Sequence, residues 1–352
     1  MMRRRMSRPI SIGDVTIGGG APVVVQSMTK TNTRDAKATI DQIRRLEECG
    51  CQLVRVAVPD RQAAAAIPAI KRGIAIPLVA DIHFDYRLAL LALEGGVDGL
   101  RLNPGNIQDP EQIKQVVLAA KERIVPIRIG VNAGSLPKAA KQEQSVVDRM
   151  VNAALAEIKS LESLDFELIK VSLKAFDVPD TIAANRALAQ QMPYPIHLGI
   201  TEAGTPKKGM IRSAVGIGIL LYEGIGDTLR VSLSGDPGEE VVAGYEILKS
   251  LDLSQHGPTL ISCPSCGRAE VDIITLANAV EERLVKLEKP VKVAVMGCVV
   301  NGPGEARDAD VGIACGKGKG VIFRKGEQVR TVEEKDFLEA LMAEVDTVAK
   351  SR

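Results

Sequence analysis

The sequence contains no tryptophan, and aromatic residues make up only 3% of its 352 residues. The core must therefore be aliphatic, and a hydrophobic share of 45% supplies enough side chains for it. So few aromatic rings argue against a surface that stacks nucleic-acid bases. No apolar run approaches the ~20 residues of a membrane-spanning helix, and no apolar segment follows the basic start, residues 1–8, as a secretory signal would require. We expect a cytoplasmic protein without nucleic-acid or membrane partners, beginning with a frayed tail.

The chain also lacks an excess of charge of either sign. Its 45 lysines and arginines and 44 acidic residues give a net charge of +1. An anionic partner would therefore have to be recognised by a local cluster of cations. Six cysteines are too few for the disulfide framework of a secreted protein of this length.

Three of the cysteines stand in glycine- and proline-rich turns near the C-terminal end. Cys263 and Cys266 form a C-x2-C pair in I-S-C-P-S-C-G-R, and Cys298 follows in M-G-C-V-V-N-G-P-G-E. Redox dithiols, zinc sites and iron–sulfur clusters all use such a pair. The turns favour a metal or cluster over buried apolar cysteines. Cys315 would be the fourth ligand if ligation were all-cysteine, which is the norm for clusters.

Eight apolar runs rich in β-branched residues alternate with amphipathic helical patterns over the first ~250 residues, which predicts a (β/α)8 TIM barrel. An open doubly wound sheet would also alternate, but the G-x-G-x-x-G fingerprint after its first strand is missing. The strand runs cover residues 23–28, 52–59, 76–84, 99–106, 126–134, 168–174, 195–202 and 228–235, and helical patterns include 36–49, 110–123, 145–161 and 239–251.

A small α+β domain is expected after a linker at residues 254–258. The fold class is therefore α/β, with the barrel in residues 1–253 and the smaller domain in residues 258–352. In the smaller domain we expect a strand leading to Cys263 and further strands at 291–296, 311–314 and 320–324. Helices are expected near 270–287 and 333–350.

Five cations lie inside the apolar strand runs: Arg55, Arg101, Arg128, Lys170 and Arg230. A cation that faces an aliphatic core is costly unless it is paired or binds an anion. Each one alone could snorkel outward or pair with a carboxylate. Five at similar places predict a strongly anionic ligand at the barrel mouth, where the planar fork of arginine suits phosphate oxygens. A diphosphate fits better than a single carboxylate.

Asp81 and Glu202 are the acids nearest these cations and are candidates for proton transfer. Salt bridges to the same arginines are the alternative role. Asp81 and His83 together would supply only two ligands of a metal, so His83 is better interpreted as a hydrogen-bond donor to the ligand. Asn103, Asn132, Ser172 and Ser232 add polar groups at the strand ends.

These motifs together resemble the family of 4-hydroxy-3-methylbut-2-enyl diphosphate synthases of the non-mevalonate isoprenoid pathway. The resemblance rests on G-L-R-L-N-P-G-N, I-R-I-G-V-N-A-G-S, G-I-T-E-A-G, L-R-V-S-L-S-G-D-P and both cysteine motifs, and it spans nearly the whole chain. It is closest to the shorter bacterial form, which has no domain inserted between barrel and cluster domain.

The resemblance implies an iron–sulfur oxidoreductase with a [4Fe–4S] cluster. The cluster ligands would be Cys263, Cys266, Cys298 and Glu305, which leaves Cys315 as a structural residue. A carboxylate is a weaker partner for a thiolate-rich cluster than a fourth thiolate, so a substrate oxygen can replace it.

The resemblance also implies the substrate, 2-C-methyl-D-erythritol 2,4-cyclodiphosphate, whose ring is opened by two-electron reduction with loss of water. The diphosphate would be held by Arg55, Arg101, Arg128, Lys170, Arg230 and Ser232. The hydroxylated carbons would meet the catalytic residues Asp81, His83, Asn132 and Glu202, with Glu202 as proton donor. Ferredoxin or flavodoxin would supply single electrons. The family works as a homodimer in which the cluster domain of one chain closes over the partner's barrel.

Two other functions remain open on the residues alone. A non-redox barrel enzyme, such as an aldolase or isomerase acting on a sugar phosphate, would use the C-terminal cysteines for structural zinc. A binding module whose cysteine domain contacts nucleic acid is disfavoured by the neutral charge and the scarcity of aromatic residues.

Overall fold

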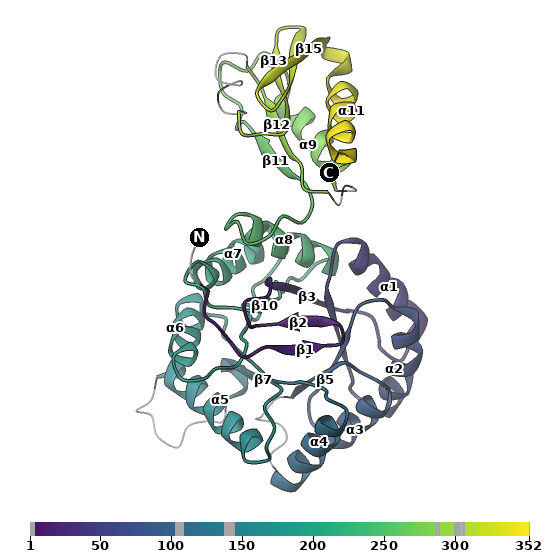
Figure 1. Ribbon diagram of the computed structural model, residues 1–352, viewed down its shortest axis with the longest axis vertical. Helices are drawn as coiled ribbons and strands as arrows, with labels where there is room; N and C mark the ends of the chain where they lie inside the picture. The colour runs from purple at the N-terminus through teal and green to yellow at the C-terminus, as the bar shows by residue number, and fades with distance from the viewer. Residues whose placement is uncertain are drawn as a thin grey trace. The chain divides into compact units, whose positions relative to one another are not determined.

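In the computed structural model the chain divides into two compact units, Met1–Ser254 and Gln255–Arg352 (Figure 1). The structure describes residues 4–102, 109–136, 145–285, 287, 289–298, 304 and 307–351. Across these ranges, no helix combines the length and the apolar character needed to cross a membrane.

The first unit is a ring of eight parallel strands, which confirms the predicted TIM barrel. The strands follow one another in the order β8-β7-β6-β5-β4-β3-β10-β9, and a bridge between Val171 and Ile196 joins the two ends of this order. An open doubly wound sheet would not close in this way. The strands are β3 (Val24–Met28), β4 (Leu53–Ala57), β5 (Leu78–Ile82), β6 (Gly99–Leu102), β7 (Ile127–Asn132), β8 (Ile169–Lys174), β9 (His197–Leu198) and β10 (Thr228–Leu229).

Among the described residues of this unit, eight helices surround the strands (Figure 1). Most begin directly after an aspartate whose carboxylate accepts a backbone N–H of the first turn, as Asp35 does for Ala38. Their apolar faces pack on the outward-facing strand residues in one continuous core. The helices are α1 (Ala36–Glu48), α2 (Arg61–Gly73), α3 (Tyr86–Glu94), α4 (Pro110–Glu122), α5 (Val146–Glu162), α6 (Val178–Ala189), α7 (Pro206–Tyr222) and α8 (Pro237–Lys249).

A hairpin of β1 (Ile10–Ile12) and β2 (Val15–Ile17) crosses the N-terminal end of the barrel (Figure 1). Its isoleucines pack on Val24, Leu53 and Val79, which form the apolar floor of the barrel interior. The predicted frayed tail is wrong from Arg4 onward. The Arg5 guanidinium donates to the carbonyls of Ala189 and Tyr194 at 3.0 and 3.1 Å, so the start of the chain is fixed to the barrel.

In the part of the second unit that the structure describes, two helices accompany a five-stranded mixed sheet. Strands β11 (Thr259–Ser262), β12 (Lys292–Met296) and β13 (Val311–Gly316) are parallel, and β14 (Lys319–Arg324) and β15 (Glu327–Glu333) continue the sheet antiparallel. Helices α9 (Ile273–Leu284) and α11 (Phe337–Lys350) contribute to its core. Strand β15 was not predicted from the sequence, and the last helix begins four residues later than the predicted 333. An exposed edge strand rich in charged residues carries little apolar pattern.

Candidate active site

The interior of the barrel changes from apolar to polar just above its floor. Along the eight strands, the polar and charged residues of the interior are Gln26, Arg55, Asp81, Arg101, Arg128, Lys170, His197 and Thr228. All are buried except Arg55, which is half-buried. Bulky aliphatic layers are the usual filling of a TIM barrel. A layer of polar and charged groups therefore favours a ligand in this interior.

Asp81 is clamped between two of the predicted arginines. The Arg101 Nη1 donates to its Oδ1 at 3.0 Å, and the Arg55 Nε lies 3.5 Å from its Oδ2. Burial alone would raise the pKa of Asp81, but the charges of Arg55 and Arg101 outweigh it and lower the pKa to about 2. Asp81 is therefore an ionised partner of the arginines in this structure. The His83 Nε2 lies 3.5 Å from the same Arg101 Nη1.

Arg230 is held by Glu240, a residue of α8 that the sequence analysis did not identify. The Arg230 Nη2 and Nε lie 3.1 and 3.2 Å from the Glu240 Oε2. The other Glu240 oxygen accepts the Leu233 N–H at 3.0 Å and lies 3.1 Å from the Lys30 Nζ. Glu240 is 1% exposed. A buried carboxylate with three such partners fixes the direction of the Arg230 guanidinium.

Arg128 and Lys170 carry nitrogens that find no hydrogen-bond partner within the described part of the chain. The Arg128 Nη1 donates to the Ser172 Oγ at 3.0 Å, but its Nε and Nη2, the Lys170 Nζ and the Arg101 Nε are buried and unpartnered there. Burial lowers the pKa of Arg128 and Lys170 well below the usual values. Unpartnered buried donors are rare because each costs free energy. They are the donors that an anionic ligand would satisfy.

Lys174 is a sixth interior cation that the sequence analysis passed over. It ends β8 opposite Asn132 of β7 and is 8% exposed. A Cβ on Gly199 would lie 2.5 Å from the Lys174 Nζ, so the glycine leaves the space that the ammonium fills. Because side chains alternate along a strand, Lys170 and Lys174 lie on the same face. This period could have identified Lys174 from the sequence.

The remaining predicted barrel residues lie at or beyond the C-terminal strand ends. Asn132 is the last residue of β7, and Ser232 follows β10; both are half-buried. Glu202 is exposed in the turn after β9. Its φ of +54° lies in the left-handed region that non-glycine residues seldom adopt, a strain that clusters at functional sites. Asn103 falls outside the described residues.

Two cysteines of the second unit, Cys263 and Cys298, lie at one edge of its sheet, and Cys266 follows Cys263 by three residues. Cys263 follows β11 and Cys298 follows β12, and these strands are parallel, so both cysteines leave the sheet at the same edge. The Gly297 N–H donates to the Cys263 Sγ at 3.3 Å. Cys266 is exposed, and hydrogen bonds from the Arg268 backbone and side chain lower its pKa. Glu305 lies outside the described residues.

The donor set fits a thiolate-bound metal group. The thiols lie on open turns, a backbone N–H is directed at the sulfur of Cys263, and the pKa of Cys266 is lowered. These features are typical of ligands of iron–sulfur clusters and zinc. Within the described ranges, no three His, Cys, Asp or Glu side chains are gathered closely enough to enclose a metal ion. The stretch 299–303 beside Cys298 lies outside those ranges.

Cys315 differs from the other three cysteines of this unit. It lies within β13, is completely buried and packs in the core of the sheet. Burial raises the pKa of its thiol to about 12. Its place inside the packed sheet, and not on an open turn, is typical of a structural cysteine.

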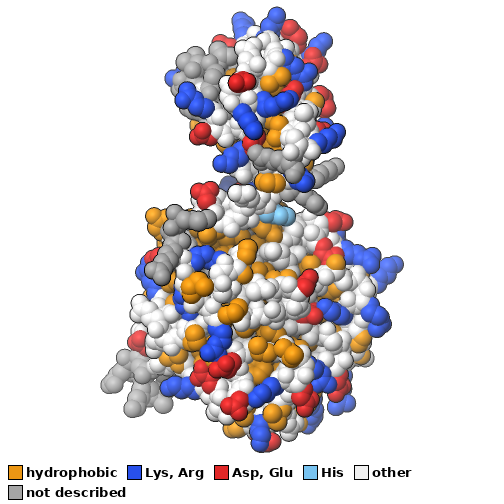
Figure 2. Space-filling view, in the orientation of Figure 1, with side chains coloured by type: hydrophobic (Ala, Val, Ile, Leu, Met, Phe, Trp, Pro, Cys, Tyr) orange, Lys and Arg blue, Asp and Glu red, His pale blue; other side chains and the backbone are white. Residues whose placement is uncertain are grey.

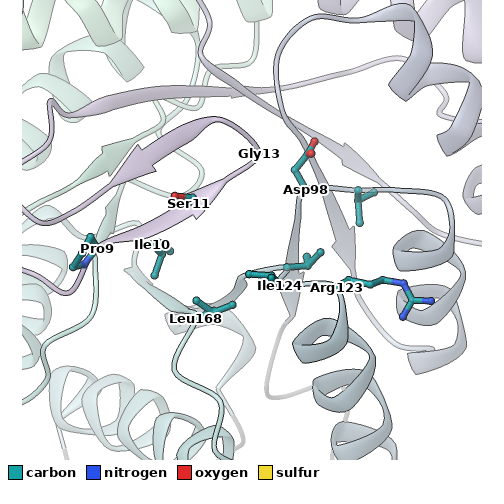
Figure 3. Close-up of a pocket in the computed structure, with 10 residues that line it drawn as sticks. Pro9, Ile10, Ser11, Gly13, Asp98, Arg123, Ile124 and Leu168 are labelled. Carbon is teal, nitrogen blue, oxygen red and sulfur yellow. The ribbon is translucent and has the colours of Figure 1, made fainter.

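A hollow of about 620 Å³ lies at the other, N-terminal end of the barrel, beside the hairpin (Figure 3). Its acid, Asp98, accepts the Leu78 N–H at 2.7 Å and pairs with Lys71, so it is already satisfied. On the face of the barrel that Figure 2 shows, hydrophobic side chains lie mainly in the middle and charged side chains lie mainly around the margin of that face. TIM-barrel active sites lie at the C-terminal strand ends, which favours the cation-lined interior over this hollow.

Comparison with known proteins identifies relatives of both units. Residues 7–245 match the family model described as the GcpE TIM-barrel domain, and residues 259–347 match the GcpE protein C-terminal domain. A 4-hydroxy-3-methylbut-2-en-1-yl diphosphate synthase (flavodoxin) of Dehalococcoides mccartyi is 63% identical over 345 residues, which cover 98% of this chain and 99% of the relative. The enzymes of the same name from Geobacter sulfurreducens and Geobacillus kaustophilus are 59% and 56% identical and cover 97% and 99% of this chain, and 98% and 94% of the relatives.

Solved structures show similarity in fold to the barrel. The dihydropteroate synthase of Yersinia pestis superposes with a TM-score of 0.52 at 12% identity, covering 69% of this chain and 98% of that one. At this identity the similarity concerns the fold alone.

Proposed function

The chain belongs to the GcpE family, and on that basis we propose that it is an iron–sulfur oxidoreductase that converts 2-C-methyl-D-erythritol 2,4-cyclodiphosphate to 4-hydroxy-3-methylbut-2-enyl diphosphate. Two electrons and one proton open the ring and release water, in the synthesis of isoprenoid precursors. The observation that carries this function is the set of buried nitrogens on Arg101, Arg128 and Lys170 that have no hydrogen-bond partner among the described residues. A diphosphate supplies the oxygens that they lack.

The electrons require a redox group, and the proposal assigns a [4Fe–4S] cluster to Cys263, Cys266, Cys298 and Glu305. The assignment of the cysteines is supported by the lowered pKa of Cys266 and by the Gly297 N–H that donates to the Cys263 Sγ. When bound, the cluster supplies single electrons. The close relatives are named for flavodoxin, and we propose flavodoxin or ferredoxin as the donor to this chain.

Within the barrel, the residues divide between binding and proton transfer. We propose that the diphosphate is held by Arg55, Arg101, Arg128, Lys170, Arg230 and Ser232, as the sequence predicts, and we add Lys174 because it is a buried cation on the same face of β8 as Lys170. Asp81 fixes Arg55 and Arg101, while His83 and Asn132 orient the hydroxylated carbons. The proton is assigned to Glu202, the donor that the family resemblance implies.

Replacing Glu202 with glutamine should lower kcat by about 10²- to 10⁴-fold, the usual contribution of a general acid, with little change in KM. Steady-state kinetics with a reduced flavodoxin system measures both constants, and the iron and sulfide content should stay at the wild-type level. Glu239→Gln, an exposed acid at the start of α8, is the matched control. An unchanged kcat in Glu202→Gln would remove this residue from the reaction.

We also propose a homodimer in which the cysteine domain of one chain serves the barrel of its partner. Support for self-association comes from α7, which exposes Ile211, Val215 and Tyr222 beside an apolar groove of about 610 Å³ between α7 and α8. Mixing two inactive variants, Cys266→Ala and Arg128→Met, should restore part of the activity, because one of the two composite sites in a mixed dimer is intact. Mixed dimers without any recovered activity would show that each site uses one chain only.

Anaerobic purification followed by assay tests the proposed function as a whole. Brown protein that contains iron and sulfide and consumes the cyclodiphosphate under reduction is the expected result. Colourless protein with stoichiometric zinc and no reductive activity would instead favour the non-redox sugar-phosphate enzyme.

A further inference from the structure

Lys170 occupies the most enclosed position of the interior cations. Its side chain extends from the middle layer of the barrel, it is 2% exposed, and its Nζ is unpartnered within the described chain. Lys174, four residues along β8, stands nearer the mouth. The two lysines differ in exposure, 2% against 8%, although burial and the charges of Arg128 and Arg55 lower the pKa of both.

Two arginines and one carboxylate act electrostatically on Lys170. Arg128 faces it in register from β7, and Arg55 acts on it from β4. On the other flank, His197 of β9 donates to or accepts from the Thr228 Oγ1 at 2.8 Å, and burial and Lys174 lower its pKa, so its ring is neutral.

The carboxylates near Lys170 are bound to other groups. Asp81 pairs with Arg55 and Arg101, and Glu240 pairs with Arg230. Asp227, before β10, accepts the Ser7 hydroxyl and the Ile196 N–H, each at 2.8 Å, and lies 3.6 Å from the Arg4 Nη2. Asp227 favours the charged form of Lys170, but burial and the arginines oppose it more strongly.

The described barrel interior holds more positive groups than its bound carboxylates offset. Arg55, Arg101, Arg128, Lys170, Lys174 and Arg230 line it, and the ion pairs above supply two carboxylates, Asp81 and Glu240. Buried charges without partners cost several kcal/mol each. Arginine cannot lose its proton in a protein, whereas a buried lysine can. Without an anionic ligand, the barrel interior can therefore lower its positive charge by deprotonation of a lysine.

We propose that Lys170 is an uncharged amine in the empty barrel and takes up one proton from solvent when a cyclic diphosphate binds beside Arg128. This inference rests on the proposed function for the identity of the anion. The two negative charges of the ligand restore the balance that makes an ammonium stable beside Arg128 and Arg55. Lys170 thereby adjusts the charge of the site between its empty and occupied states.

Proton uptake by Lys170 makes the affinity for the ligand depend on pH, and the direction of this dependence follows from the proposal. A group that gains a proton on binding makes affinity fall as pH rises, by up to about tenfold per pH unit while it is neutral in the free protein and charged in the complex. Each phosphorus of the cyclic diphosphate carries a single, strongly acidic oxygen. The ligand therefore does not titrate near neutral pH, and the proton uptake reports on the protein.

Nuclear magnetic resonance of the cluster-loaded full chain with ¹⁵N-labelled lysine tests the state of the empty barrel. The Lys170 side-chain signal is identified by its loss in Lys170→Met, and at pH 7.5 its Nζ shift should be that of a neutral amine. After addition of the cyclodiphosphate the shift should be that of an ammonium. An ammonium shift in the empty protein overturns the inference, whether or not any ligand binds.

Calorimetry of cyclodiphosphate binding in two buffers of different ionisation enthalpy counts the protons taken up. Lys170→Met should take up about one proton fewer than the wild type, and Lys71→Met, a lysine paired with Asp98 outside the site, should match the wild type. Equal uptake in Lys170→Met and the wild type overturns the inference. Absence of binding to the wild type overturns the proposed function instead, and the shift of the empty protein still decides the charge of Lys170.

Discussion

Replacing any one of Cys263, Cys266 or Cys298 with serine is expected to remove the iron–sulfur cluster and with it the reductase activity. Serine has nearly the same shape as cysteine, but its hard oxygen replaces a soft thiolate, which is the ligand that iron–sulfur clusters select. Removing a residue that hydrogen-bonds to a metal ligand typically lowers metal affinity or activity roughly 10- to 100-fold. Removing a ligand itself should lower cluster content and activity by more than that. Visible absorption, iron and sulfide content, and single-turnover reduction of the cyclodiphosphate measure the loss.

Cys315→Ala is the matched control for these three variants. Cys315 lies on the neighbouring strand of the same sheet, but its thiol is buried in the core. The expected result is a cluster content equal to that of the wild type, with a modest loss of stability from the small cavity. Loss of the cluster in Cys315→Ala, together with normal turnover in Glu305→Ala, would reverse the assignment of the fourth ligand.

The barrel could be predicted from the sequence because its signals are local. Eight apolar runs and the helical patterns between them repeat a unit that few folds accommodate. The β1–β2 hairpin left no such signal, since each strand has three residues and is stabilised by packing on Val24, Leu53 and Val79 of other strands. Such contacts are distant in sequence and carry no periodicity.

The cations of the candidate site could be predicted from the sequence, but the carboxylates that pair with them could not. Arg55, Arg101 and Arg128 are conspicuous because a charge interrupts each apolar run. Glu240 is not conspicuous, because an acid in the first turn of a helix is common and usually solvated. Its contact with Arg230 depends on how α8 docks on the barrel. Lys174 was missed because it stands at the end of its run, where a polar residue is ordinary.

The strength of the interior cations as binding groups follows from the cost of burying them. Within the described residues, the Arg128 guanidinium makes one side-chain hydrogen bond, to Ser172, and its Nε and Nη2 have no acceptor. An apolar side chain of similar size would avoid that cost, and such replacements of buried charges are often neutral or stabilising by about 1–4 kcal/mol. Stability and function therefore place opposite demands on this position.

Arg128→Met should accordingly weaken substrate binding while leaving the empty protein at least as stable as the wild type. Loss of a buried charged hydrogen-bond partner costs about 2–5 kcal/mol, or roughly 30-fold to several thousand-fold in affinity. Calorimetric titration and denaturant unfolding measure the two effects, and the cluster spectrum should not change. Arg186→Met, which breaks an exposed pair with Glu223, should alter affinity little and stability by less than about 1 kcal/mol. A destabilised Arg128→Met with normal affinity would make Arg128 a structural residue and would place the diphosphate elsewhere.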